Sequence, residues 1–241
     1  MPLEIKDRIS VLLSSIAILI SILTLAVVQH RQSNEDQDKE GRLFQSMYTL
    51  GSRMELIQET ANDIRFAAPS AVEYQRQLEK KHDDLLIEIQ MTLDQWELKT
   101  EMVKFVQNVG KGIGLVADEI KGRYGIRAFA AYVLGGQAQS MDMRSSMLAP
   151  GTDTSVKCRD LQQQIAISKQ PSASLLDTGP DQPDSCEINY LNGFPNWVQP
   201  MNSAITTLGG SVKIASNPKT VKEAAEALQS ALWALQAKWQ R

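Results

Sequence analysis

The sequence predicts an all-α protein, and three observations lead to this expectation. Apolar side chains recur at spacings of three and four residues over residues 43–64, 86–103 and 221–239. This spacing is typical of helices that pack along a heptad seam, as in a coiled coil or a helical bundle. No stretch alternates apolar and polar residues over enough length to form a sheet. We therefore expect an N-terminal membrane helix, a bundle of long helices and an irregular, loop-rich lobe.

Composition limits the classes of function. The chain has 241 residues and a net charge of −3, so no bulk basicity points to a nucleic-acid partner. Two histidines and two cysteines are too few for a zinc site of four cysteines or of three histidines. We accordingly expect no nucleic acid, no metal and no cofactor.

The segment Ile9–Val28 is uncharged and apolar, and it is predicted to be a single transmembrane anchor. A helix of this length spans about 30 Å, the thickness of the hydrocarbon core. The alternative is a cleaved signal peptide, but the run exceeds the about 7–15 apolar residues of such peptides, and no small-residue cleavage site follows. The sequence thus predicts a single-pass signal-anchor protein of the cell membrane, in contact with the lipid bilayer.

Prolines and glycines suggest where the elements begin and end. Residues 1–8 are a flank, 9–28 the anchor and 29–148 the long-helix part of the bundle. Pro69 should end a first helix near residue 67, because proline opposes a helical residue before it. Ser70, with Glu73 three residues on, predicts a capping box for a helix that runs to about residue 108. Glycines at positions 110, 112 and 114 predict a break, followed by a helix over residues 115–147.

Residues 149–216 form the predicted loop-rich lobe, which holds six of the nine prolines. Short helices are expected there at residues 156–168 and 197–207. Residues 217–241 form the predicted C-terminal bundle helix, with Asn217 as N-cap and Pro218 in the first helical position.

Cys158 and Cys186 lie at the two ends of the most irregular stretch of the lobe. A disulfide between them would stabilise the fold by about 3–4 kcal/mol in the chain-entropy model. Because a disulfide needs an oxidising compartment, it favours an extracytoplasmic (periplasmic) position for the soluble part. Two free thiols in a cytoplasmic domain are the alternative.

No residues assemble into a recognisable catalytic set. The Asp177-Thr178-Gly179 tripeptide occurs once and is followed by proline, so we interpret it as a turn and not as half of an aspartic-protease site. The glycines at 110–114 match neither the dinucleotide fingerprint nor the Walker A loop. We therefore name no catalytic residue and do not predict an enzyme.

The favoured function is that of a scaffold or accessory subunit that acts through contact with a protein partner or through self-association. Phe194 and Trp197 are the predicted partner-binding residues, since aromatic anchors dominate many interfaces. One alternative is an extracytoplasmic small-molecule sensor, which a pocket between the long helices would favour. Another is a hydrolase or toxin-like membrane effector, which two carboxylates with raised pKa values in one cleft would favour.

Overall fold

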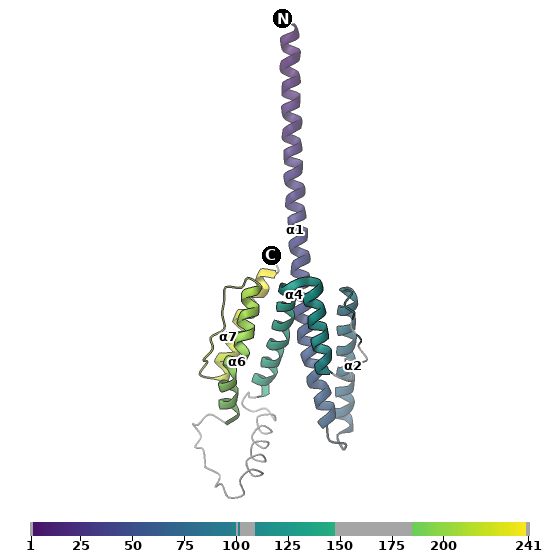
Figure 1. Cartoon of the computed structure of the whole chain (residues 1–241), viewed down its shortest axis with the longest axis vertical. Coiled ribbons are helices and arrows are strands. Elements are labelled where there is room, and N and C mark those ends of the chain that lie inside the picture. Colours follow the sequence, from purple (N-terminus) through teal and green to yellow (C-terminus); the bar gives the residue numbers. More distant parts are fainter. Residues whose placement is uncertain (1, 100, 102–108, 148–184, 240–241) are drawn as a thin grey trace.

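The computed structural model describes residues 2–99, 101, 109–147 and 185–239, and within these ranges it contains helices and no strands (Figure 1). The prediction of an all-α fold is confirmed. In chain order the helices are α1 (Pro2–Phe66), α2 (Val72–Gln95), α4 (Val109–Met147), α6 (Ser185–Thr207) and α7 (Val221–Trp239).

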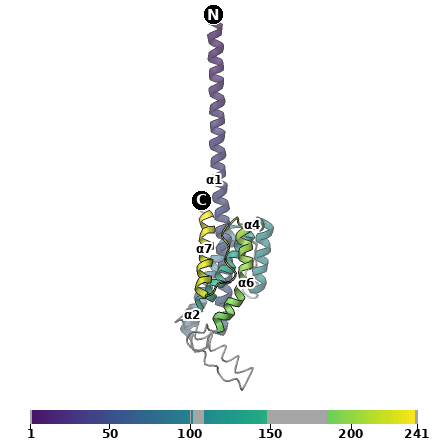
Figure 2. The same cartoon turned by 90° about the vertical axis from the view of Figure 1, so that its left-hand side faces the viewer.

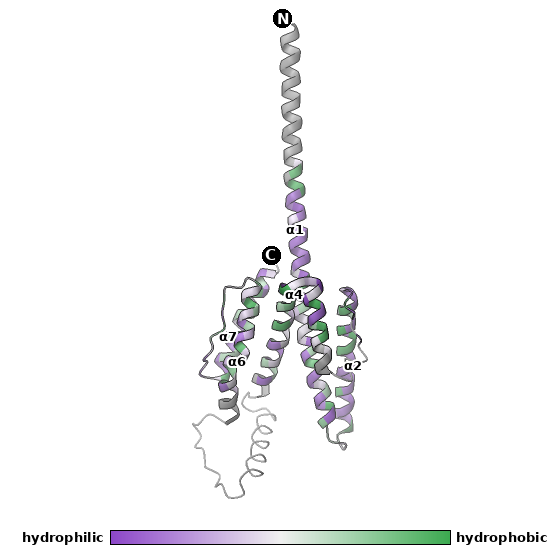
Figure 3. Ribbon diagram, viewed as in Figure 1, coloured by the Kyte–Doolittle hydropathy of each residue, from purple (hydrophilic) through white to green (hydrophobic). Residues whose placement is uncertain are grey.

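Helix α1 packs against α2, α4 and α7, and α6 packs on α4. Met47, Leu50, Met54 and Ile57 are at most 1% exposed, and their spacing of three and four residues places them on one stripe of the helix. The central part of the predicted seam, residues 47–57, is therefore confirmed, while Leu43, Ala61 and Ile64 at its two ends are half-buried. Above the bundle, α1 carries an exposed hydrophilic stretch that Figure 3 shows in purple.

The predicted anchor Ile9–Val28 is the first part of this unbroken helix of 65 residues. Within the ranges that the structure describes, no helix is long and apolar enough to cross a membrane. This finding contradicts the predicted transmembrane helix, the signal-anchor assignment and the single-pass membrane localisation. The prediction rested on a local run of 20 residues, whereas the helix that contains it continues without a break into a charged, exposed stretch and then into the bundle.

Helix α2 differs from its prediction at both ends. Ala71 precedes its first turn without a side-chain hydrogen bond, so the capping box of Ser70 and Glu73 is wrong. The helix ends at Gln95, well before residue 108, because the chain turns there in a Schellman motif. Glu97 takes the left-handed conformation (φ 52°) that glycine usually supplies, and the next residue, Leu98, returns into the core.

Helix α4 begins at Val109, so the predicted break at the glycines of residues 110–114 is wrong. Packing outweighs the loss of helix propensity at these glycines, since Val116 and Ile120 in the following turns of α4 are fully buried. The chain bends instead at Gly125, whose φ of 83° and ψ of −178° are not helical. Figure 1 shows the reversal at the upper end of the bundle, where Arg127 pairs with Glu40 of α1.

The predicted lobe is in part a bundle helix. Residues 148–184, which include the helix expected at 156–168, lie outside the described residues. Residues 185–207 form α6, which is longer than the helix expected at 197–207 and contains both Pro195 and Pro200. Figure 2 shows α6 and α7 beside each other, and Figure 1 agrees. Helix α7 starts at Val221 and not near Asn217, because the Thr220 hydroxyl caps it by accepting the Glu223 N–H at 3.1 Å.

Candidate ligand site between α1, α4 and α7

The second arm of α4 lies directly on α1, and glycines make this approach possible. A Cβ atom on Gly51 would overlap the carbonyl oxygen of Tyr132, and one on Gly135 would overlap that of Tyr48. The two backbones are therefore in contact at this crossing. Ser52 Oγ donates a hydrogen bond of 2.8 Å to Gln139 Oε1, which holds the side chain of Gln139 beside α1.

Helix α7 packs across the same two helices. It buries a stripe of small and aliphatic residues at the helical spacing: Ala224, Leu228, Ala231 and Leu235. Near its C-terminal end, the Trp239 ring lies 6.0 Å from that of Phe44 and 6.1 Å from that of Tyr48, measured between centroids. These aromatic contacts attach α7 to α1 just above the glycine crossing.

A groove of about 330 Å³ lies between the three helices. Helix α1 contributes Tyr48, and the other lining residues come from α4 (Ala138, Gln139, Asp142) and α7 (Ala225, Leu228, Gln229, Leu232, Trp233, Gln236). Among the described residues, the lining contains one carboxylate, three glutamine amides and no basic residue. Trp233, one of the lining residues, is 65% exposed, so much of its side chain is accessible to solvent.

The phenol of Tyr48 stays neutral in this environment. Burial raises its pKa above the usual value of 10.0, and the negative charge of Asp142 raises it further. At neutral pH the hydroxyl can therefore both donate and accept a hydrogen bond.

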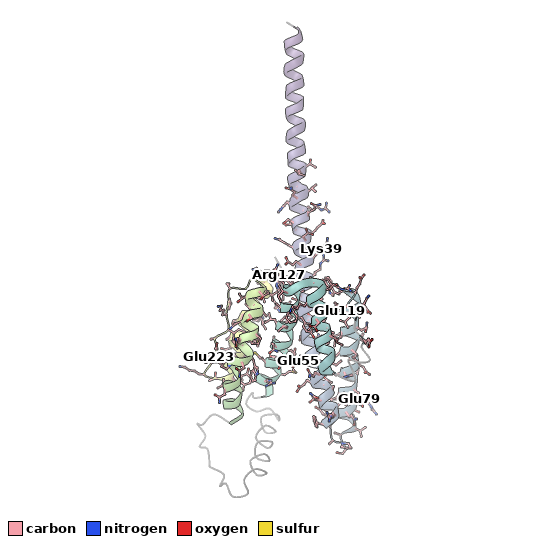
Figure 4. All side chains as sticks on the ribbon, in the orientation of Figure 1. Lys39, Glu55, Glu79, Glu119, Arg127 and Glu223 are labelled. Atoms are coloured by element: carbon pink, nitrogen blue, oxygen red, sulfur yellow. The ribbon has the colours of Figure 1, made fainter. Side chains whose placement is uncertain are left out.

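A second polar cluster lies deeper, between α1, α4 and α6. Burial raises the pKa of Glu55, opposed by the charge of Arg144 and by a hydrogen bond with Ser140, whereas Glu59 raises it further. Arg144 also lies 4.6 Å from the centre of the Trp197 ring on α6. Figure 4 labels Glu55 in the middle of the bundle. This residue does not line the groove.

The two predicted partner-binding residues belong to the same region of α6. Phe194 is 0% exposed and packs in the core beside Tyr190, with ring centroids 6.0 Å apart. Trp197 is half-buried, edge-on to Tyr190 and covered on one face by Arg144. Neither ring is an exposed anchor in this arrangement, so their role in partner binding stays a prediction without geometric support.

The predicted Cys158–Cys186 disulfide is not supported. Cys158 lies outside the described residues, and no pair of cysteines at disulfide distance occurs in the part of the chain that the structure describes. The prediction assumed a lobe with little core of its own, whereas α6 buries Phe194, Val198 and Met201 in the bundle. The turn predicted at Asp177–Gly179 also lies outside the described residues.

Sequence reasoning missed every residue that lines the groove. Asp142, Gln229 and Gln236 are polar residues within helices, and such residues are usually solvated. The one usable signal is the Gly135–Gly136 pair inside a helix, since paired glycines often mark a close helix crossing.

Comparisons of the chain with protein-family models, with curated proteins and with solved structures find no match. The assignment of a function therefore depends on the geometry alone.

Proposed function

We propose that this protein is a helical-bundle receptor that binds a small molecule in the groove between α1, α4 and α7. The observation that carries the proposal is the groove itself, whose volume of about 330 Å³ lies in the range typical of ligand sites. Its lining combines apolar side chains with converging amide, phenol and carboxylate groups, which is the usual composition of such sites. The proposal keeps the small-molecule binding of the sensor alternative and assigns no compartment.

The groove favours binding over catalysis. General acid–base chemistry at a cleft commonly uses two titratable groups whose environments separate their pKa values. Here the lining has one carboxylate, Asp142, while Glu55, whose pKa is raised, belongs to the deeper cluster. The two carboxylates do not line one cleft, so the arrangement that would favour a hydrolase is missing from this groove.

The proposal is tested by ligand-observed NMR on the full chain with a set of small cationic, neutral and anionic compounds. Ala225 lines the groove, so Ala225→Phe places a ring in the space that a ligand would occupy. Ala237→Phe is the matched control, because Ala237 is an exposed residue of the same helix outside the groove.

We expect at least one compound to bind the wild type and the control, and to lose binding in Ala225→Phe. Circular dichroism checks that both variants keep their helix content. If no compound binds the wild type, or if Ala225→Phe binds as well as the control, the groove is not a ligand site.

Contact with a protein is a second candidate, favoured by a different feature. An apolar groove of about 470 Å³ runs between α4 and α6, with Ile126, Phe129 and Val133 on one side and Pro200 and Ala204 on the other. Ile126 is 54% exposed. If two copies of the chain associate here, Ile126→Glu will lower the dimer fraction in light scattering, and Leu115→Glu, at an equally exposed site on the other arm of α4, will not.

A further inference from the structure

We propose that the ligand of the α1/α4/α7 groove is an uncharged, planar nitrogen heterocycle with an amino group beside a ring nitrogen, such as the adenine base of a nucleoside. The inference rests on the proposed function, because it names the chemical class that the same site would select. Three features point to this class: an exposed indole ring, glutamine amides on both sides of it, and a described lining without a basic side chain.

The lining residues of α7 include one continuous stripe along the helix. Ala225, Gln229, Trp233 and Gln236 follow one another at spacings of four, four and three residues, and all of them line the groove. Residues at these spacings lie on the same face of a helix. Trp233 therefore has one glutamine a turn before it and another a turn after it. A flat ring placed on the indole lies between these two amides.

Trp233 differs from the other three tryptophans of the chain. The rings of Trp96, Trp197 and Trp239 each pack edge-on against a tyrosine, at centroid distances of 5.7, 5.3 and 6.1 Å. Among the described residues Trp233 has no such ring partner, and it is 65% exposed. Its indole face is therefore available to the ring of a ligand, and aromatic side chains commonly bind nucleobases by stacking of this kind.

The glutamine amides match the edge of such a heterocycle. An adenine-type base presents an amino donor next to a ring-nitrogen acceptor, and a glutamine can pair with both through its carbonyl and NH₂ groups. Gln229 and Gln236 offer both groups from α7. Gln139 on α4 has a narrower role, because its Oε1 accepts the hydrogen bond of 2.8 Å from Ser52 and its NH₂ group is left to donate to a ring nitrogen. Since Ser52 already orients Gln139, less side-chain entropy is lost when it binds.

The groove suits a base and not a phosphate group. Proteins bind phosphates with lysine, with arginine or with the N-terminus of a helix. No lysine, arginine or histidine occurs among the described residues that line the groove. The lining residues of α7 begin at Ala225, beyond the first turn of a helix that starts at Val221. We therefore expect a free base or a nucleoside and not a nucleotide.

The test compares adenosine with purine riboside, which keeps the ring system and the sugar but lacks the amino group, and with adenosine monophosphate. Each is titrated into the full chain and followed by ligand-observed NMR. We expect adenosine to bind about fivefold more tightly than purine riboside, a difference that corresponds to one neutral hydrogen bond. The monophosphate should bind no more tightly than adenosine.

Three variants locate the source of binding. Trp233→Leu removes the stacking surface, so it should weaken adenosine and purine riboside alike by about tenfold. Since Trp233 is exposed, this variant should keep its thermal midpoint. The double variant Gln229→Ala with Gln236→Ala should reduce the preference for adenosine over purine riboside to within about twofold, because the acceptors for the amino group are gone. Gln37→Ala, at an exposed glutamine of α1 outside the described lining, is the matched control and should change neither affinity.

The outcomes separate this inference from the proposed function. Equal binding of adenosine and purine riboside, a preference that survives the double glutamine variant, or undiminished binding in Trp233→Leu would overturn the inference of a heterocycle. Tighter binding of the monophosphate would also overturn it, because the groove would then select a nucleotide. If adenosine does not bind while other compounds bind and lose binding in Ala225→Phe, the inference fails and the ligand site itself stands. If no compound binds, both the inference and the proposed function fail.

Discussion

The glycine crossing of α1 and α4 offers the sharpest test of the fold that builds the groove. In Gly51→Ala, the new Cβ would overlap the carbonyl oxygen of Tyr132 and lie 3.1 Å from the backbone nitrogen of Gly136. Both neighbours are backbone atoms, so no side-chain rotation can relieve the overlap, and the two helices have to move apart. Overpacking of this kind costs up to about 3 kcal/mol.

Part of this cost is offset within the helix, because alanine is a better helix former than glycine by about 1 kcal/mol. The net effect of Gly51→Ala should therefore be a loss of about 2 kcal/mol in the free energy of unfolding. Gly122→Ala is the matched control, since nothing lies within 4 Å of its added Cβ. That variant should gain up to about 1 kcal/mol from the same difference in propensity.

Equilibrium unfolding in urea, followed by circular dichroism, measures both variants against the wild type. The two substitutions should shift the midpoint in opposite directions. If Gly51→Ala is as stable as the wild type, or if both variants gain stability equally, the backbones of α1 and α4 do not touch at this crossing.

Three further predictions concern the helices around the site. Asn202→Ala removes two side-chain hydrogen bonds, of 2.8 and 2.9 Å, to the backbone of Ile214, so it should lower the free energy of unfolding in urea by about 2 kcal/mol. Asn192→Ala, at an exposed site, should lower it by less than about 0.5 kcal/mol. Thr220→Ala removes the N-cap of α7 and should cost about 1 kcal/mol, while Thr220→Ser should restore most of it. The wild type should lose stability as the pH rises above 4.5, the ordinary pKa of Glu55, and Glu55→Gln should lose less over the same range. Thermal unfolding over a pH series measures both proteins.

The direction of the Glu55 effect follows from its raised pKa. Burial favours the protonated carboxyl group in the folded state, so the associated stability is fully present below the unfolded pKa. That stability is lost as the pH rises through the higher, folded pKa. A wild type that gains stability relative to Glu55→Gln over this range would contradict the raised pKa of Glu55 in the folded state.

The sequence allowed the helices, but not their junctions, to be predicted. The stripe of Met47, Leu50, Met54 and Ile57 was predictable because burial on one face leaves a period of three and four residues. The end of α2 was not predictable, because Glu97 adopts the left-handed conformation there. A glycine or asparagine at this position would have indicated a helix end in the sequence, but a glutamate does not.

The groove could not be predicted for a different physical reason. Its residues come from three helices, and Tyr48, Gln139 and Trp233 share no spacing in the sequence. The length of the apolar run Ile9–Val28 likewise led to a membrane assignment that no helix among the described residues supports. Phe194 looked like an exposed aromatic in a proline-rich loop, but α6 turns it into the core.

The most direct test of a ligand site between α1, α4 and α7 is fluorine NMR of the full chain, labelled with fluorinated tryptophan and titrated with a compound that binds the wild type in the ligand-observed NMR test. The Trp233 resonance is assigned by its disappearance in Trp233→Phe. This resonance should shift with the compound, while that of Trp96, which packs on Tyr124 outside the groove lining, should not. A bound compound that shifts Trp96 and leaves Trp233 unchanged, or a titration that shifts neither, would contradict a ligand site in this groove.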